Sequence, residues 1–401
     1  MAGLSPPVAA ATAPSQRERA LPLPESYPYR KAFPLGGRCL WPRPQTDEGQ
    51  PAGDCPQTGR ASRLRPHQSP SVTAPPSGES LYIQFYEQGV FVYEKTSTKY
   101  RGIIPAFYAC YAPDGSISTE GVKALTRHLI AKGVKGVYVG GSSGECIYQH
   151  PDERKAVLEA VMSEAKGKIT VIAHVACNNT ADSVELAAHA EKCGVDAIAS
   201  IPPIYFHLPN YAIADYWNAM SARATTAFII YNIPQLAGTA LTMPLLNDML
   251  KNPNVIAVKN SSMPTQDIQM FKDAGIQARG ADGFAVFNGP DEQFVSGRVM
   301  GADGGIGGTY AVMPELFIHM NELIEQGDIP AARAIQYKAD RIIYKMCEAK
   351  GNLYAVMKEI LRRMYGLDLG GVRAPLANLA PEDEAIVAEA QRMIEEAVAA
   401  L

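Results

Sequence analysis

The 401-residue sequence lacks three features that would each point to a particular class of protein. Its seven cysteines are irregularly spaced, without a Cys-x-x-Cys pair or a histidine pair at metal-ligand distance, so we expect neither a metal site nor a disulfide framework. A net charge of −4 supplies no basic field for nucleic acid or anionic membranes. No run of about 18 uncharged apolar residues could span a bilayer. These absences favour a cytoplasmic protein that binds neither nucleic acid nor membrane.

The first 80 residues differ in composition from the rest of the chain. They contain 15 of the 30 prolines and show no apolar periodicity. A segment with so little apolar surface cannot offset the entropy lost on ordering, so we interpret residues 1–80 as a disordered, proline-rich extension. Residues 81–98 are apolar enough to pack, but the role of this lead-in stays open.

From residue 99 onward, short apolar runs alternate with amphipathic helical patterns. The runs are continuously apolar, which indicates strands of a parallel sheet buried on both faces. Eight runs occur, at residues 102–111, 136–143, 169–176, 197–203, 227–234, 255–262, 284–288 and 305–310. Eight strand–helix repeats predict a (β/α)₈ TIM barrel over residues 99–312 rather than an open, doubly wound sheet. The helical pattern of residues 313–401 predicts a C-terminal helical appendage.

Lys259 is a candidate nucleophile, because it lies in the apolar run Val255-Ile-Ala-Val-Lys-Asn260. Burying a charged lysine is costly, so its pKa should fall and a neutral amine become accessible. A neutral amine attacks a ketone to form a Schiff base. The alternative is a lysine that extends to solvent at a strand end or pairs with a carboxylate.

Tyr231 ends an equally apolar run on the preceding strand, which is adjacent in a barrel. A phenol in that place can relay protons to and from the substituents of a bound ketone, as imine chemistry requires. A tyrosine at a strand end is more often a packed ring with its hydroxyl hydrogen-bonded. Two such residues on adjacent strands favour the catalytic interpretation.

Two further strand ends could bind substrate. The turn Gly140-Gly-Ser-Ser-Gly-Glu145 offers the hydroxyls of Ser142 and Ser143 and several backbone N–H groups, which suit a small carboxylate. The same serines could instead cap the turn. Asp291 and Glu292 could bind vicinal hydroxyls of a polyol, or cap a helix running from Pro290 to Met300.

Taken together and in this order, these motifs resemble the pyruvate-dependent class I aldolase superfamily, which contains dihydrodipicolinate synthase and N-acetylneuraminate lyase. The resemblance covers about residues 99–390. It implies that Lys259 forms an imine with a 2-oxo acid, that Tyr231 shuttles protons, and that Ser142 and Ser143 bind the carboxylate. It further implies that Tyr205 joins the proton relay of a neighbouring subunit, and hence a homo-oligomer, either a tetramer or a dimer.

The residue after Tyr231-Asn-Ile-Pro-Gln indicates the branch of the superfamily. Synthases resemble a pattern with arginine there, whereas this chain has Leu236 and so resembles the lyases. The segment from Asn288 to Glu292, with Gly289, Asp291 and Glu292, resembles the lyase segment that holds the glycerol-like tail of the sugar. Gly308 departs from the lyases, which usually have serine there. Ser143 and Ser261 replace threonines and keep the hydroxyl.

The resemblance therefore implies a lyase without cofactor that cleaves N-acetylneuraminate to pyruvate and N-acetylmannosamine through an imine on Lys259. Within the enzyme class, the alternatives are a condensation of the dihydrodipicolinate synthase type and an aldolase for another 2-keto-3-deoxy sugar acid. A sensor that binds pyruvate or a sugar acid without catalysis is the alternative from another class. The presence of both the amine and the phenol weighs against a sensor.

Overall fold

The computed structural model describes residues 96–401. The expected extension over residues 1–80, and all but the end of the lead-in over 81–98, therefore lie outside the described residues. Among the described helices, none is both long and apolar enough to cross a membrane. The five cysteines of this part are free thiols, namely Cys110, Cys146, Cys177, Cys193 and Cys347.

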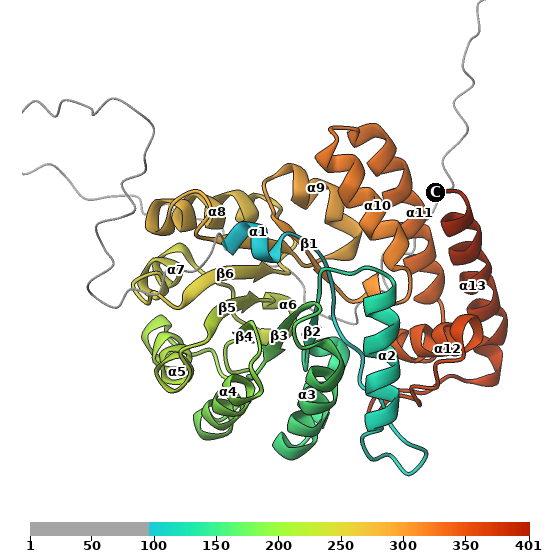
Figure 1. The fold of residues 1–401 in the computed structure, drawn as a ribbon, viewed down its shortest axis with the longest axis horizontal. Coiled ribbons are helices and arrows are strands. Elements are labelled where there is room, and N and C mark those ends of the chain that lie inside the picture. The colour runs from blue at the N-terminus through green and yellow to red at the C-terminus, as the bar shows by residue number, and fades with distance from the viewer. Residues whose placement is uncertain (1–95) are drawn as a thin grey trace, which may run out of the picture. The chain divides into compact units, whose positions relative to one another are not determined.

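Eight parallel strands form a barrel with helices between them, which confirms the predicted fold (Figure 1). The strands are β1 Gly102–Pro105, β2 Gly136–Val139, β3 Thr170–His174, β4 Ala197–Ser200, β5 Ala227–Asn232, β6 Val255–Asn260, β7 Ala285–Asn288 and β8 Gly304–Gly307. Each strand pairs with its neighbour in the chain, and β8 pairs with β1. A parallel bridge between Ala106 and Tyr138 joins β1 to β2, so the ring of strands closes.

Helices connect the strands, and most of them bury one apolar face against the outside of the barrel. They are α1 Thr96–Tyr100, α2 Thr119–Ala131, α3 Pro151–Ala165, α4 Thr180–Cys193, α5 Asn210–Arg223, α6 Pro234–Ala237, α7 Met243–Met249, α8 Gln266–Arg279, α9 Phe294–Val299 and α10 Pro314–Glu325. One core cluster fills the space between strands and helices, and a second fills the barrel interior. Tyr100 of α1 belongs to the interior cluster, where its ring meets Phe287 edge to face at 6.4 Å.

Three further helices follow α10, as the helical pattern predicted: α11 Ile329–Met346, α12 Leu353–Tyr365 and α13 Glu384–Ala399. They gather with α10 on one side of the barrel (Figure 1). A buried ion pair ties α12 to the loop after β2, because the Lys358 ammonium lies 3.0 Å from the Glu145 carboxylate. The side chains of Lys358 and Glu145 are 2% and 0% exposed, so the pair exists without solvent screening.

Candidate active site

Tyr231 and Lys259 are direct partners in the register of β5 and β6, so they lie side by side inside the barrel. Both residues are 3% exposed. The Lys259 ammonium lies 3.9 Å from the centre of the Tyr231 ring and 4.3 Å from the centre of the Tyr138 ring. The fold thus brings together the two side chains that the sequence singled out. The Tyr138 ring also contacts the amine.

Burial lowers the pKa of Lys259 to about 7, while the negative charge of Asp291 acts in the opposite direction. A substantial share of neutral amine is therefore available near neutral pH, as attack on a ketone requires. The alternative of a lysine extending to solvent does not apply, because the side chain is enclosed by aromatic rings.

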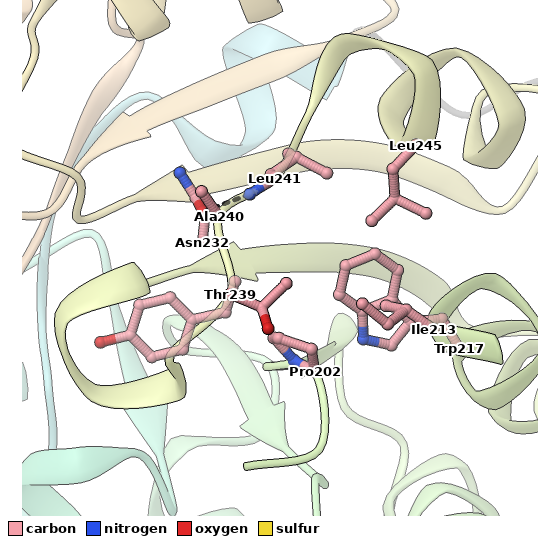
Figure 2. Close-up of a pocket in the computed structure, with 9 residues that line it drawn as sticks. Pro202, Ile213, Trp217, Asn232, Thr239, Ala240, Leu241 and Leu245 are labelled. Atoms are coloured by element: carbon pink, nitrogen blue, oxygen red, sulfur yellow. Dashed lines mark hydrogen bonds between the residues drawn. The ribbon is translucent and has the colours of Figure 1, made fainter. Parts of the chain in front are cut away.

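Burial also raises the pKa of Tyr231 to about 12, and interactions with the Ser261 and Ser142 hydroxyls limit the rise. The phenol is therefore neutral and can donate a proton to a developing oxyanion. Tyr231 also lines a small pocket that has no room for a water molecule, and Figure 2 shows other residues that line it. The lining residues include Pro202, Ile213, Trp217, Thr239 and Leu241. Lys259 is not among the residues that line this pocket.

The residues that follow the reactive pair are joined by their side chains. The Asn232 amide donates a hydrogen bond of 2.8 Å to the side-chain oxygen of Asn260, and both residues are buried. Asn232 also accepts a hydrogen bond from the Leu241 N–H at 2.9 Å (Figure 2). Asn260 accepts one from the Ser262 hydroxyl at 2.9 Å. The ends of β5 and β6 are thus locked to each other and to the loops that follow them.

The serine turn after β2 is a short 3₁₀ helix, Ser142–Gly144, followed by Glu145 in the left-handed region at φ 52°. Ser143 is buried, and its hydroxyl donates to the Tyr354 hydroxyl of α12 at 3.4 Å. Its carbonyl accepts a hydrogen bond from the Ala109 N–H at 3.3 Å. Ser142 lies close enough to the Tyr231 hydroxyl to lower its pKa, which places the turn beside the reactive pair.

Asp291 and Glu292 do not cap a continuous helix over 290–300, because the chain there forms a 3₁₀ turn, Asp291–Gln293, followed by the short helix α9. Neither the turn nor α9 has a side-chain cap. Instead, one carboxylate oxygen of Asp291 accepts hydrogen bonds from the N–H and the hydroxyl of Thr309, both at 2.7 Å. Its other oxygen is buried without a hydrogen-bond partner.

Burial, together with the charge of Glu292, raises the pKa of Asp291 to about 7. Burial likewise raises the pKa of Glu292. Gly308 lies between Asp291 and the serine turn: a Cβ atom added there would lie 3.4 Å from the Ser143 hydroxyl and 3.9 Å from the nearer Asp291 oxygen. The Gly308 carbonyl accepts a 2.7 Å hydrogen bond from the Tyr108 hydroxyl. Asp291, Gly308 and Ser143 therefore border one corner of the site.

Gly289 approaches Ser261 closely. A Cβ atom at Gly289 would lie 2.0 Å from the Ser261 hydroxyl oxygen and 2.8 Å from the Asn260 carbonyl. The Gly289 N–H donates to that carbonyl at 2.8 Å. A glycine is therefore required where the loops after β6 and β7 meet, next to Ser261. The role of Ser261 and Gly289 in binding substrate stays a prediction.

Tyr205 lies apart from these residues. Its side chain is 87% exposed, its backbone has φ 85°, and its ring contacts Phe206 edge to face at 4.9 Å. Strain of this kind needs compensation elsewhere. The assignment of Tyr205 to the site of a neighbouring subunit stays a prediction.

Several residues beside the reactive pair were not found from the sequence. The Tyr138 and His174 rings both meet the Tyr231 ring edge to face, at 5.7 and 6.0 Å. Burial lowers the pKa of His174 to about 3, so this imidazole is neutral. Tyr138 and His174 lie in apolar strands, where the parity shared with Tyr231 was the available signal. No signal in the sequence pointed to Tyr354, because a tyrosine in an amphipathic helix is typical of the hydrophobic core.

Within residues 96–401, no three His, Cys, Asp or Glu side chains gather in a way that could hold a metal ion. The polar groups around Lys259 are hydroxyls, amides and one carboxylate pair, which suit an organic acid carrying several hydroxyl groups.

Comparison with known proteins identifies the family to which the chain belongs. The model of the dihydrodipicolinate synthetase family matches residues 99–394. The chain belongs to this family. The N-acetylneuraminate lyase of Mediterraneibacter gnavus is 66% identical over 297 residues, which cover 74% of this chain and 93% of the relative. The N-acetylneuraminate lyase of Salmonella agona is 34% identical over 301 residues, which cover 74% and 98%.

A solved structure of the wild-type sialic acid aldolase of Ruminococcus gnavus matches with a TM-score of 0.72 and 65% identity, covering 75% of this chain and 98% of that one. The structure of its catalytic lysine mutant matches with a TM-score of 0.73 and 64% identity, covering 75% and 97%. The superfamily inferred from the sequence motifs is thus confirmed, and so is the leaning toward its lyase members.

Proposed function

We propose that this family member is an N-acetylneuraminate lyase that releases pyruvate and N-acetylmannosamine. The observation that carries the proposal is the buried pairing of Tyr231 with Lys259, with the amine 3.9 Å from the phenol ring. A depressed amine pKa beside a neutral phenol suits imine chemistry and needs no cofactor. The lyase named in the M. gnavus relative supports the choice of substrate.

In the proposed reaction, the neutral Lys259 amine attacks the C2 ketone of the open-chain sugar acid, and loss of water gives a protonated imine. The serine turn holds the substrate carboxylate through Ser142 and Ser143. The Tyr231 phenol passes its own proton to that carboxylate as it takes the proton of the C4 hydroxyl. The C3–C4 electron pair then moves into the imine, and the sugar leaves as the aldehyde. The resulting enamine takes up a proton at C3, and water hydrolyses the imine to release pyruvate and the free amine.

Leu236 favours the lyase over the synthase-type condensation. A second substrate carboxylate needs a cation, best a guanidinium that meets both oxygens. Leu236 lies in α6, directly after the loop from Tyr231, and is 52% exposed, so it supplies no charge there. Asp291, Glu292, Ser261 and Gly289 would instead bind the hydroxyl-rich part of the sugar. Tyr205 would act in a neighbouring subunit of a cytoplasmic homo-oligomer.

The test is pyruvate release from a panel of sialic acids and 2-keto-3-deoxy sugar acids, with aspartate semialdehyde plus pyruvate as the synthase arm. We expect N-acetylneuraminate to be cleaved fastest, and a borohydride-reduced pyruvyl adduct to be found on the peptide containing Lys259. Lys259→Met should lose both while keeping the fold. Faster condensation than cleavage, or an adduct on another lysine, would overturn the proposal.

A further inference from the structure

Helix α12, which follows all eight strands in the chain, places the phenol of Tyr354 beside the serine turn. Tyr354 lies in the first turn of α12, after the N-cap Asn352, whose side chain accepts the Tyr354 N–H at 3.0 Å. The Tyr354 hydroxyl meets the Ser143 hydroxyl at 3.4 Å. The Tyr354 and Tyr108 rings lie 6.3 Å apart, and Tyr108 is bonded to the Gly308 carbonyl. Tyr354 thus completes the corner formed by Ser143, Gly308 and Asp291.

Side chains of α12 and of the turn after β2 together hold Tyr354 in position. Lys358, one turn further along α12, pairs with Glu145, which comes two residues after Ser143. Lys358 also donates to the Gly371 carbonyl at 2.7 Å, and Glu145 accepts the Arg373 N–H at 2.9 Å. The helix that carries Tyr354 and the turn that carries Ser143 are therefore tied by a buried contact close to both residues.

The hydrogen-bond pattern leaves the phenol proton of Tyr354 available. In the contact with Ser143, the serine hydroxyl donates and the phenol oxygen accepts. The phenol can still donate its own proton. Burial raises the pKa of Tyr354 to about 12, the charges of Asp291 and Glu145 add to the rise, and the Ser143 hydroxyl opposes it. The phenol is therefore neutral and keeps a proton that it can donate to an acceptor beside Ser143.

We infer that Tyr354 is a substrate-binding residue whose hydroxyl donates a hydrogen bond to the carboxylate of the 2-oxo acid at the serine turn. The inference rests on the proposed function, because it takes the ligand of that turn to be the carboxylate. It adds a third hydroxyl to those of Ser142 and Ser143, supplied by the C-terminal helices.

The test compares Tyr354→Phe with Tyr365→Phe, which removes a phenol from the other end of the same helix, where it accepts a hydrogen bond from Lys132. The readout is the pyruvate concentration that gives half-maximal borohydride trapping of Lys259. Losing a hydrogen bond to a charged group costs at least about a factor of ten, so Tyr354→Phe should raise this concentration about tenfold or more. Tyr365→Phe should leave it unchanged.

Methyl pyruvate separates carboxylate binding from packing, because the ester carries no charge. We expect the effect of Tyr354→Phe to be much smaller with methyl pyruvate than with pyruvate. An equal shift for both compounds would show that Tyr354 acts through packing, and no shift for either would show that it does not contact the ligand. A shift only in the KM for N-acetylneuraminate would place it on the sugar; each of these three results overturns the inference. If pyruvate does not label Lys259 in the wild type, the proposed function itself fails.

Discussion

The side chains of Asn232 and Asn260 bond to each other at 2.8 Å, one residue beyond Tyr231 and Lys259 on the same two strands. Successive side chains on a strand point to opposite faces, so the asparagines lie on the helix side of the barrel wall while the reactive pair lies inside. The Leu241 N–H donates to the Asn232 side-chain oxygen, and the Ser262 hydroxyl donates to that of Asn260. The pair fixes how far β5 and β6 slide past each other, and with it the contact between phenol and amine.

Asn232→Ala should therefore lower kcat as well as stability. It leaves the buried Leu241 N–H without an acceptor, which costs about 1–3 kcal/mol of unfolding free energy. A shifted strand end also separates Tyr231 from Lys259, so kcat should fall more than KM changes. The control is Asn218→Ala, which removes another 2.8 Å amide–amide bond, donated by Asn252, away from the site. Loss of stability with unchanged kcat would limit the asparagines to a structural role.

The pH dependence of imine formation should report the pKa of Lys259. Burial lowers this pKa to about 7, so the neutral amine increases as the pH rises through that value. We expect the rate of cyanoborohydride trapping with pyruvate to rise up to pH 7 and to level off about one unit above it. Asp291→Asn removes a charge that raises the pKa, so the rise should move to lower pH. A rate that keeps increasing to pH 10 would contradict a depressed pKa.

Breaking the ion pair between Glu145 and Lys358 should be costly, whereas removing both charges should not. Lys358→Met leaves a buried carboxylate without its cation, which costs about 3–5 kcal/mol of unfolding free energy. The double variant Glu145→Gln with Lys358→Met should recover much of this loss. Urea unfolding measures both, and the exposed pair of Lys251 and Asp248 offers a control, with Lys251→Met expected to change stability little. Equal losses in the single and double variants would argue against a coupled pair.

Glu292→Gln should weaken binding of the sugar without affecting pyruvate. A carboxylate that accepts hydroxyl protons contributes about 1.5–3 kcal/mol per charged hydrogen bond, so KM for N-acetylneuraminate should rise about tenfold or more. Pyruvate trapping at Lys259 should be unchanged, because pyruvate has no chain of hydroxyls. Glu382→Gln, at the start of another 3₁₀ turn, is the matched control. Asp291→Asn is less clean, since it also disturbs the bonds to Thr309.

The fold could be predicted from the sequence because continuous apolar runs separated by amphipathic helices leave few architectures. The apolar runs are longer than the strands, however. The first expected run reaches residue 111, whereas β1 ends at Pro105. Tyr108 and Cys110 are buried without pairing in the sheet, and the Tyr108 hydroxyl contacts the Met357 sulfur of α12. Composition reports burial and does not distinguish a paired strand from another buried segment.

Within the site, the predictable residues were those whose type conflicts with their surroundings. A lysine inside an apolar strand stands out, and so do a serine-rich turn and adjacent acids at strand ends. Tyr138 and Tyr354 do not, because tyrosine is common in strands and in the apolar faces of helices. Their place beside Lys259 and Ser143 results from barrel closure and from the docking of α12, which no local pattern encodes.

The contact between Glu145 and Lys358 spans 213 residues of the chain, and α12 follows all eight strands. During synthesis, the ribosome therefore releases Lys259 and Tyr231 well before Lys358 and Tyr354. A nascent chain with a complete set of strands already carries the amine and the phenol, but its Glu145 lacks the Lys358 ammonium and its Ser143 hydroxyl lacks Tyr354. The corner formed by Ser143, Gly308, Asp291 and Tyr354 is therefore complete only after the residues of the reactive pair have left the ribosome.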